Sequence, residues 1–441
     1  MPGIGFTPDN GDEEESKGNN PFAFESFGEI FKHFSAMGLN LPALMASLSG
    51  QASPASLSKE MIRDISRKHL SAHGEVPVTV EDLTQIQEAI NIADLWINEA
   101  TAFPTLPLTD SIALSRRDWI DTTLDGWQGL TKPLVDSMAD ALSSMLDQGL
   151  PGPDGGDAIS IPGFGPMSIS KSSITAIMAT FMSSLISTQL GQSIGSLSTT
   201  VTGANDVALP LSRDIKAQLL PQNVRAWGSG LEIADAEVRI YLSLREIAAA
   251  RLFKQSPWLS EYIRKAISDY GRGIRIDISA ITQSAQEAMD SGAIDPSNPE
   301  SMALAISGGI FTPETSPSQS AALEKLETLL ALIEGWIDAV VAKAATDRLP
   351  SLIRLRETQA RRRATNSPTQ QLFATLLGLE VSPRLTREAI TFWERIEKID
   401  SISARDRIWE EAFLLPTAGQ LLDPEGFYKS WQIPDDLSGL N

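Results

Sequence analysis

The amino-acid sequence predicts a mainly α-helical protein with little or no β-sheet. Apolar residues recur at helical spacing almost everywhere after residue 55. No stretch alternates apolar and polar residues long enough to indicate a sheet, although Gly273–Ser279 ("GIRIDIS") could form one short strand. With 441 residues, 42% of them hydrophobic, the chain can bury one large core or two modest ones.

Caps and apolar stripes indicate individual helices. At 79–101, Thr79 can cap the first turn, with Asp82 three residues on in a variant of the capping box. A helix over 115–146 is expected to bend or break near Pro133. Two more helices are expected at 318–345 and 386–399. The predicted inward residues are Leu83, Ile86, Ile90, Ala93 and Ile97 in the first helix, and Leu326, Leu329, Leu330, Ile333 and Ile337 in the third.

Composition divides the chain into an acidic N-terminal segment, 1–54, and a helical domain, 55–441. The segment is Gly- and Asn-rich, which predicts disorder, and it lacks the basic region and apolar core of a signal peptide. The Gly/Pro-rich loop at 147–167 is the clearest break in the domain, and a candidate boundary between two helical lobes.

Charge and cysteine content narrow the classes of function. The absence of cysteine excludes disulfides, thiolate catalysis and sulfur-ligated metals, and it fits a cytoplasmic location. A net charge of -20 opposes binding to nucleic acid or to anionic membranes. The uncharged segment between Lys171 and Asp206 is interleaved with Ser, Thr and Gln, and is expected to form a buried helix of a soluble protein with no membrane span. The expected partner is an unidentified protein or peptide.

Histidine is scarce: His33, His69 and His73 are the three in the chain. The spacing of His69 and His73 could place two imidazoles on one helix face for a metal, but two ligands without a third make a weak site. The alternative is a solvated helix end before Gly74. The basic run Arg354–Arg363 has two interpretations as well, a site for phosphate or an acidic partner, or one helix face that neutralises an acidic protein.

A helix over Val238–Leu259 is predicted to be amphipathic and to stop at Pro257. Its apolar stripe has an arginine in the middle: Val238, Leu242, Arg245, Ala249 and Leu252. A buried guanidinium needs a carboxylate, because an unpaired buried charge is strongly unfavourable. The alternative is that Arg245 reaches solvent along its aliphatic stem.

Together with "EGWIDAV", "DRLPSLIRLRETQARRRAT", "LFATLLGLEVSPR" and "LLPTAGQLLDPEGF", this helix resembles the zincin-like metallopeptidase family of actinobacteria. Members of that family are described as candidate zinc-dependent metalloproteases or hydrolases. The resemblance covers nearly all of the chain from about residue 80, and it implies a zincin-like helical fold for the 55–441 domain.

The resemblance also implies where a metal site would lie. In the better-equipped branch of the family, a His-Glu-x-x-His motif on this helix holds zinc, and its glutamate is the general base. Here the motif reads Arg245-Glu246-Ile247-Ala248-Ala249, and a later Glu-Gly-His reads Glu334-Gly335-Trp336. A further histidine before Pro-Trp-Leu is replaced in "FKQSPWL". Arginine stays protonated and alanine has no lone pair, so only Glu246 of the motif could bind a metal, with Glu334 as a possible partner. Two carboxylates can hold Ca²⁺ or Mg²⁺ but make a poor catalytic zinc site, and no cofactor is expected.

These positions predict a degenerate metal site. Glu246 would be a vestigial general base, and Arg245, Glu334, Trp336 and Ala249 would mark the lost ligand positions, with Arg245 paired to Glu334 or Glu246. The resulting interpretation is a pseudoenzyme with a non-catalytic binding or scaffolding role. One alternative is a metal-dependent hydrolase or peptidase with an atypical ligand set, drawing on His69 or His73. A third hypothesis is an anion binder that uses Arg354–Arg363.

Overall fold

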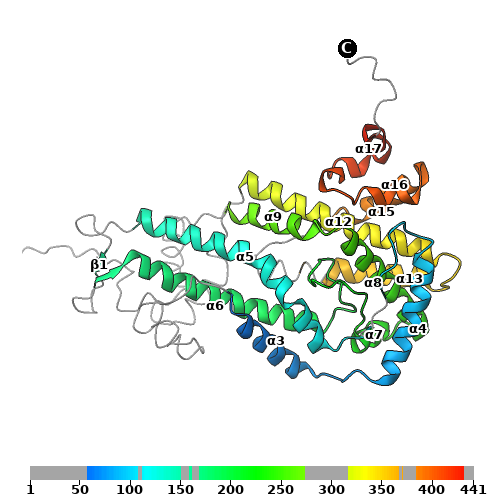
Figure 1. Ribbon diagram of the computed structural model, residues 1–441, viewed down its shortest axis with the longest axis horizontal. Coiled ribbons are helices and arrows are strands. Elements are labelled where there is room, and N and C mark those ends of the chain that lie inside the picture. The colour runs from blue at the N-terminus through cyan, green and yellow to red at the C-terminus, as the bar shows by residue number, and fades with distance from the viewer. Residues whose placement is uncertain are drawn as a thin grey trace, which may run out of the picture.

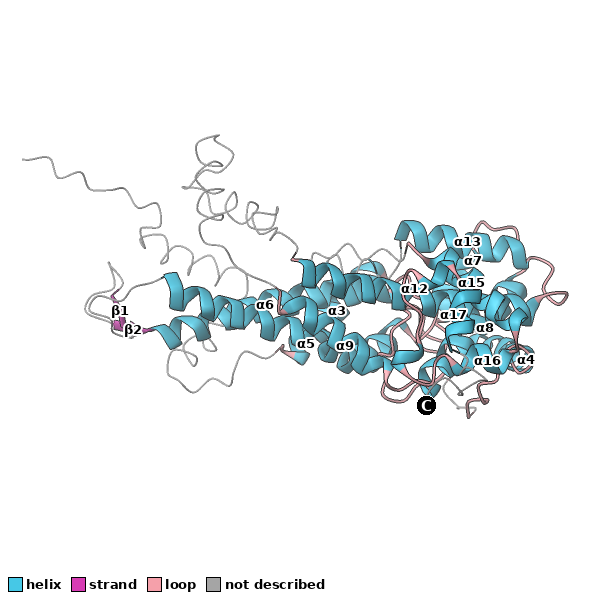
Figure 2. Cartoon of the chain, turned by 90° about the horizontal axis from the view of Figure 1, so that it is seen from above, coloured by secondary structure: helices cyan, strands magenta, loops and turns pink. Residues whose placement is uncertain are grey.

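The computed structural model describes residues 57–107, 112–149, 158–160, 168–273, 316–366, 370 and 384–431. These residues are mainly helical, as the sequence predicts, and they form an elongated molecule (Figures 1 and 2). The predicted N-terminal segment 1–54 and most of the candidate strand Gly273–Ser279 lie outside the described residues.

One part of the molecule is built from four packed helices: α3 (Lys59–His73), α5 (Arg116–Gly149), α6 (Lys171–Ser198) and α9 (Leu259–Gly271). Helices α5 and α6 pack against each other, and between them in the chain β1 (Ala158–Ser160) pairs antiparallel with β2 (Ser168–Ser170). Helix α5 runs through Pro133 without an interruption, and the bend predicted there stays a prediction. The lobe boundary at 147–167 stays a prediction.

Helix α6 is the uncharged segment of the sequence, and it packs closely on α3. Two glycines make this approach feasible: a Cβ on Gly191 would lie 2.8 Å from the Ile65 Cβ, and one on Gly195 would lie 2.7 Å from the His69 Cβ. Ser66 also donates a hydrogen bond of 2.9 Å to the Gly191 carbonyl. The described helices include none that is long and apolar enough to cross a membrane.

The second part surrounds α8 (Asp235–Gln255), which packs against α4 (Val80–Ile97), α7 (Pro221–Gly228) and α12 (Pro317–Ala345). Every residue of α8 from Tyr241 to Phe253 is buried. This middle part of the predicted amphipathic helix is therefore enclosed on all faces, and it includes the charged residues Arg245, Glu246 and Arg251. Its end before Pro257 is confirmed.

Several local predictions are confirmed. Thr79 and Asp82 form the capping box of α4, and α15 (Thr386–Ile399) spans the predicted residues. Leu83 is an exception to the predicted stripe of α4, because it is 37% exposed. The predicted inward leucines and isoleucines of α12 are all buried. The remaining elements are α13 (Leu352–Asn366), α16 (Ile402–Arg407), η2 (Ala412–Leu414), η3 (Gln420–Leu422) and α17 (Pro424–Trp431).

Candidate functional site

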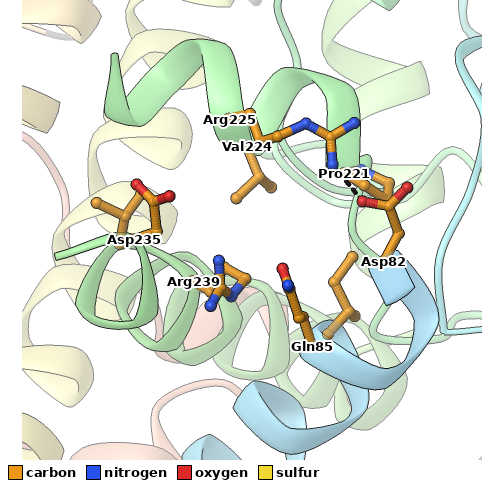
Figure 3. A pocket seen from close by; sticks show the side chains of 9 residues that line it. Asp82, Gln85, Pro221, Val224, Arg225, Asp235 and Arg239 are labelled. Atoms are coloured by element: carbon orange, nitrogen blue, oxygen red, sulfur yellow. Dashed lines mark hydrogen bonds and ion pairs between the residues drawn. The ribbon is translucent and has the colours of Figure 1, made fainter. Parts of the chain in front are cut away.

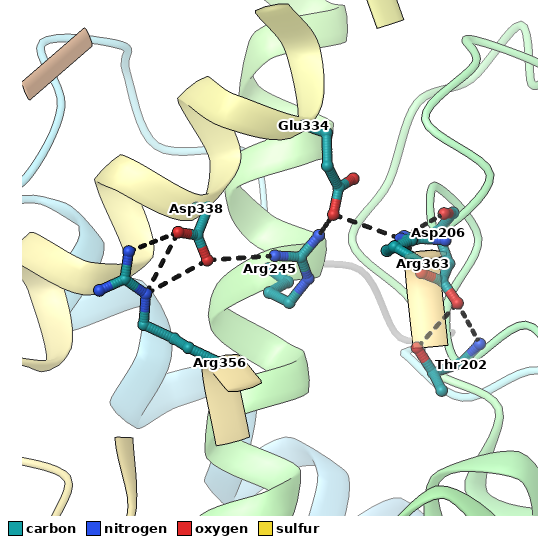
Figure 4. A network of polar contacts seen from close by, with 7 residues as sticks. All are labelled: Thr202, Asp206, Arg245, Glu334, Asp338, Arg356 and Arg363. Carbon is teal, nitrogen blue, oxygen red and sulfur yellow. Dashed lines mark hydrogen bonds and ion pairs between the residues drawn. The ribbon is translucent and has the colours of Figure 1, made fainter. Parts of the chain in front are cut away.

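Arg245 lies on α8 in the buried space between α8 and α12, and its side chain is 7% exposed. Its guanidinium forms an ion pair with Glu334, and its Nη1 lies 3.9 Å from the Asp338 carboxylate (Figure 4). Glu334 and Asp338 are four residues apart and therefore lie on one face of α12. The predicted pairing of Arg245 with Glu334 is confirmed, and the alternative in which Arg245 reaches solvent is wrong.

Two further arginines from α13 extend this pair. Arg363 lies 3.2 Å from Glu334 and 2.6 Å from Asp206, while Arg356 lies 2.5 Å from Asp338. Arg356 and Arg363 are seven residues apart, two turns of one helix face. We call the complete set the arginine–carboxylate cluster. Its members are Arg245, Arg356, Arg363, Asp206, Glu334 and Asp338.

The formal charges of the cluster balance, with three arginines and three carboxylates in alternation (Figure 4). Burial alone would raise the pKa of Glu334, but Arg245 and Arg363 outweigh it and the pKa is lowered. Burial alone would lower the pKa of Arg245 and of Arg363, but Glu334 and the other neighbouring acidic groups raise both. Arg245, Arg363 and Glu334 therefore keep their charged forms at physiological pH.

Glu246, the next residue along α8, faces a different part of the fold. Its carboxyl group accepts hydrogen bonds from the Asn205 amide at 3.1 Å, the Asn205 side chain at 2.7 Å and the Gln218 amide at 3.2 Å. Gly203 lies so close that a Cβ there would clash with the Glu246 carboxyl group. These hydrogen bonds hold the segment between α6 and α7 against α8.

Glu246 should make stability pH-dependent. Burial raises its pKa to about 8, against the hydrogen bonds from Gln218 and Asn205, which lower it. With a folded-state pKa above the unfolded one, the folded state binds more protons between about pH 4.5 and 8, so stability falls as pH rises through that window. Compared with Glu246→Gln, the free energy of unfolding of the wild type should fall by up to about 1.4 kcal/mol per pH unit in this range. Urea unfolding at a series of pH values measures this difference. Parallel curves for the two proteins would contradict this.

The structure places the other predicted site residues apart from the cluster. Trp336 is fully buried, donates a hydrogen bond of 2.9 Å to Asp406, and lies against Phe103 and Arg405. Because Trp336 follows Glu334 by two residues, its side chain points to a different side of α12. Ala249 is buried one turn after Arg245.

The histidines of α3 pack on each other and on α6. The rings of His69 and His73 stack at 4.4 Å, and His69 contacts α6 at the position of Gly195. Burial lowers the pKa of His69, and His73 lowers it further. His33 lies outside the described residues.

Three arginines of the basic run pair with carboxylates, which agrees with the interpretation that the run neutralises an acidic protein. Arg356 and Arg363 belong to the cluster, and Arg362 lies over the Trp227 ring at 4.5 Å and donates to the Trp227 carbonyl. Arg354 donates to the Leu231 carbonyl at 2.6 Å. These contacts hold α13 against the body of the protein, while Arg361 lies on its exposed side and pairs with Glu357.

One motif escaped sequence reasoning. Gly191-Gln192-Ser193-Ile194-Gly195 has the Gly-x-Ser-x-Gly spacing of a nucleophile elbow, which requires a strand-to-helix turn. All five residues lie inside α6, and both glycines face α3. The Ser193 hydroxyl is buried, and among the described residues it has no hydrogen-bond partner that could act as its base. The Gly-x-Ser-x-Gly spacing in this chain is explained by the close packing of α6 on α3.

The residues present do not fit a catalytic zinc ion. Zinc takes three protein ligands from His, Cys, Asp or Glu in such sites. Within the described residues, no group of three or more such side chains is placed to hold a metal. Glu334 on α12 is already bound by two guanidinium groups.

Comparison with known proteins gives the family. A crystal structure of a candidate hydrolase with a novel fold from Chloroflexus aurantiacus is similar at a TM-score of 0.56 and 16% identity, covering 86% of this chain and 100% of that one. This likeness shows a shared fold. No curated protein matches the chain. The family model described as zincin-like metallopeptidase matches residues 58–428. The chain therefore belongs to the zincin-like metallopeptidase family.

Proposed function

We propose that this protein is a non-catalytic binding member of its family, in which the Arg245 guanidinium takes the place of a metal ion. The observation that carries the proposal is the position of Arg245, buried on α8 and paired with Glu334 on α12. By the family resemblance, Arg245 stands at the position of the first histidine of His-Glu-x-x-His, and Glu334 stands at the glutamate of Glu-Gly-His.

The balance of charges between α8 and α12 supports the replacement of a metal ion by Arg245. A metal between α8 and α12 would attract carboxylates from both sides, and a buried carboxylate without a cation is strongly unfavourable. Arg245 supplies a positive charge with several N–H donors, so it can hold Glu334 directly and Asp338 at longer range. The two core helices stay bridged although the histidines are gone.

The surroundings of Glu246 also support a non-catalytic role. A general base of a zinc hydrolase must reach a metal-bound water. The Glu246 carboxyl group is instead enclosed by Asn205, Gln218 and Gly203. In this proposal Glu246 is a structural residue that anchors the 202–219 segment.

The zinc content of the purified, untagged protein tests the proposal. After incubation with Zn²⁺ and extensive dialysis, we expect elemental mass spectrometry to find well below one zinc ion per chain. The matched variant Arg245→His/Ala249→His restores both motif histidines and removes one of the two guanidinium groups that hold Glu334, so it should retain more zinc than the wild type.

Stoichiometric zinc in the wild type would contradict the proposal and favour the alternative, a hydrolase or peptidase with an atypical ligand set. His69→Ala/His73→Ala would then show whether the α3 histidines supply the ligands. Loss of zinc in that variant, with the helical circular dichroism spectrum unchanged, would assign the metal to α3.

A further inference from the structure

The cleft where α4, α7 and α8 begin is too small to serve as a ligand site (Figure 3). Its volume is about 20 Å³, room for about one water molecule. Arg225 and Asp82 on its rim already pair with each other (Figure 3). A larger surface is offered by α5 and α6, which extend together beyond α3 and α9 (Figures 1 and 2).

Helix α3 covers only the second half of α6. The two helices run in the same direction, because the Ser184 hydroxyl donates to the Met61 sulfur at 3.9 Å and Gly195, further along α6, approaches His69. Residues 171–183 of α6 therefore lie before the first turn of α3, which begins at Lys59. Among the described elements, α6 packs mainly on α3 and α5. In the described part of the chain, the first half of α6 thus lacks the cover that α3 gives to the second.

The side of α6 that faces α3 continues into this first half. Positions 177, 184 and 191 are seven residues apart, so they lie on one side of the helix, and Ser184 and Gly191 contact α3 there. The sequence of the first half has no charge after Lys171. Its large apolar residues are Ile174, Ile177, Met178, Phe181 and Met182. This composition suits contact with the apolar face of another helix.

The sequence that leads into α3 contains such a face. Four phenylalanines are spaced by three and four residues, which predicts one side of a helix over residues 24–34: Phe24, Phe27, Phe31 and Phe34. The charged residues of this stretch fall on the opposite side: Glu25, Glu29 and Lys32. Residues 35–56 connect it to Leu57 and can span up to about 70 Å. Residues 171–184 of α6 cover only about 20 Å, so the stretch can reach all of the first half.

We propose that residues 24–34 bind as an amphipathic helix to the first half of α6 and continue the cover that α3 provides. The phenylalanine face packs on the uncharged helix, and Glu25, Glu29 and Lys32 face water. A tethered segment acts at an effective concentration on the order of millimolar, which favours this stretch over a free partner. The surface shares no residue with the arginine–carboxylate cluster, so the zinc measurement does not bear on it.

Hydrogen–deuterium exchange of the full-length protein, followed by mass spectrometry, tests the proposal. Amides of residues 26–34 should exchange at least about 10-fold more slowly than in an unstructured chain. Phe27→Ser/Phe31→Ser should abolish this protection and also speed exchange in residues 172–183, because both partners lose their apolar contact. Phe6→Ser is the matched control outside the stripe and should alter neither region. Unprotected amides at 26–34 in the wild type, or unchanged exchange at 172–183 in the double variant, would overturn the proposal.

Thiol cross-linking locates the bound segment, since the chain has no cysteine of its own. Position 173 lies on the α3-facing side of α6, three turns before Ser184. Full-length Ser26→Cys/Ser173→Cys should form an intramolecular cross-link with a short bismaleimide. Ser26→Cys/Thr84→Cys, with its second thiol on the exposed side of α4, should give much less. Equal yields in the two variants, or cross-linked dimers in place of monomers, would contradict binding within one chain.

Discussion

Glu334→Leu is expected to lower the free energy of unfolding by about 3–5 kcal/mol, because removal of one member of a buried ion pair leaves its partner uncompensated. Both Arg245 and Arg363 lose a carboxylate in this variant. Arg363 keeps Asp206, but Arg245 keeps only the 3.9 Å contact with Asp338. Urea unfolding followed by circular dichroism measures the loss.

The double variant Arg245→Met/Glu334→Leu provides the decisive comparison. It replaces the pair with apolar groups and leaves Arg356–Asp338 and Arg363–Asp206 intact. Such replacements are often neutral or stabilising, so the double variant should recover most of the lost stability. Glu261→Leu, which removes an exposed ion pair with Arg264, should change stability by less than about 1 kcal/mol. Additive losses in the double variant would show that Arg245 and Glu334 act independently.

Asp406→Ala is expected to cost at least about 4 kcal/mol of unfolding free energy, because one buried carboxylate satisfies four donors from three parts of the chain. Asp406 is 2% exposed and accepts from the Thr101 hydroxyl at 2.6 Å, the Ala102 amide at 2.8 Å, the Trp336 Nε1 at 2.9 Å and the Arg405 Nε at 2.8 Å. It therefore joins α16 to α12 and to the chain that follows α4.

Asp406→Asn shows how much of the effect at this buried residue comes from the negative charge and how much from the number of accepted hydrogen bonds. The amide keeps one acceptor oxygen, so its cost should lie between that of Asp406→Ala and wild type. Asp136→Ala, at an exposed pair with Lys132, serves as the surface control and should change stability by less than about 1 kcal/mol. A loss of similar size for Asp406→Ala and Asp136→Ala would refute the structural role of Asp406.

The candidate site was only partly predictable. An arginine within an apolar stripe requires a buried partner, and the resemblance pointed to Glu334, which the structure confirms. Asp206 could not be found in this way, because it lies in a segment without regular structure between α6 and α7. Arg356 and Arg363 were visible as part of a basic run, but their inward direction depends on how α13 docks against α8 and α12.

The same limit applies to the fold. The capping box at Thr79 and the helix stop before Pro257 depend on a few adjacent residues, so the sequence by itself determined them. Which helices enclose α8 depends on contacts between residues far apart in the chain. Tertiary packing alone therefore decided that α8 is buried on all faces, that Trp336 turns to Asp406, and that three arginines and three carboxylates meet. The physical reason is that local periodicity encodes which face of a helix is apolar, whereas ion-pair partners are selected when the helices pack together.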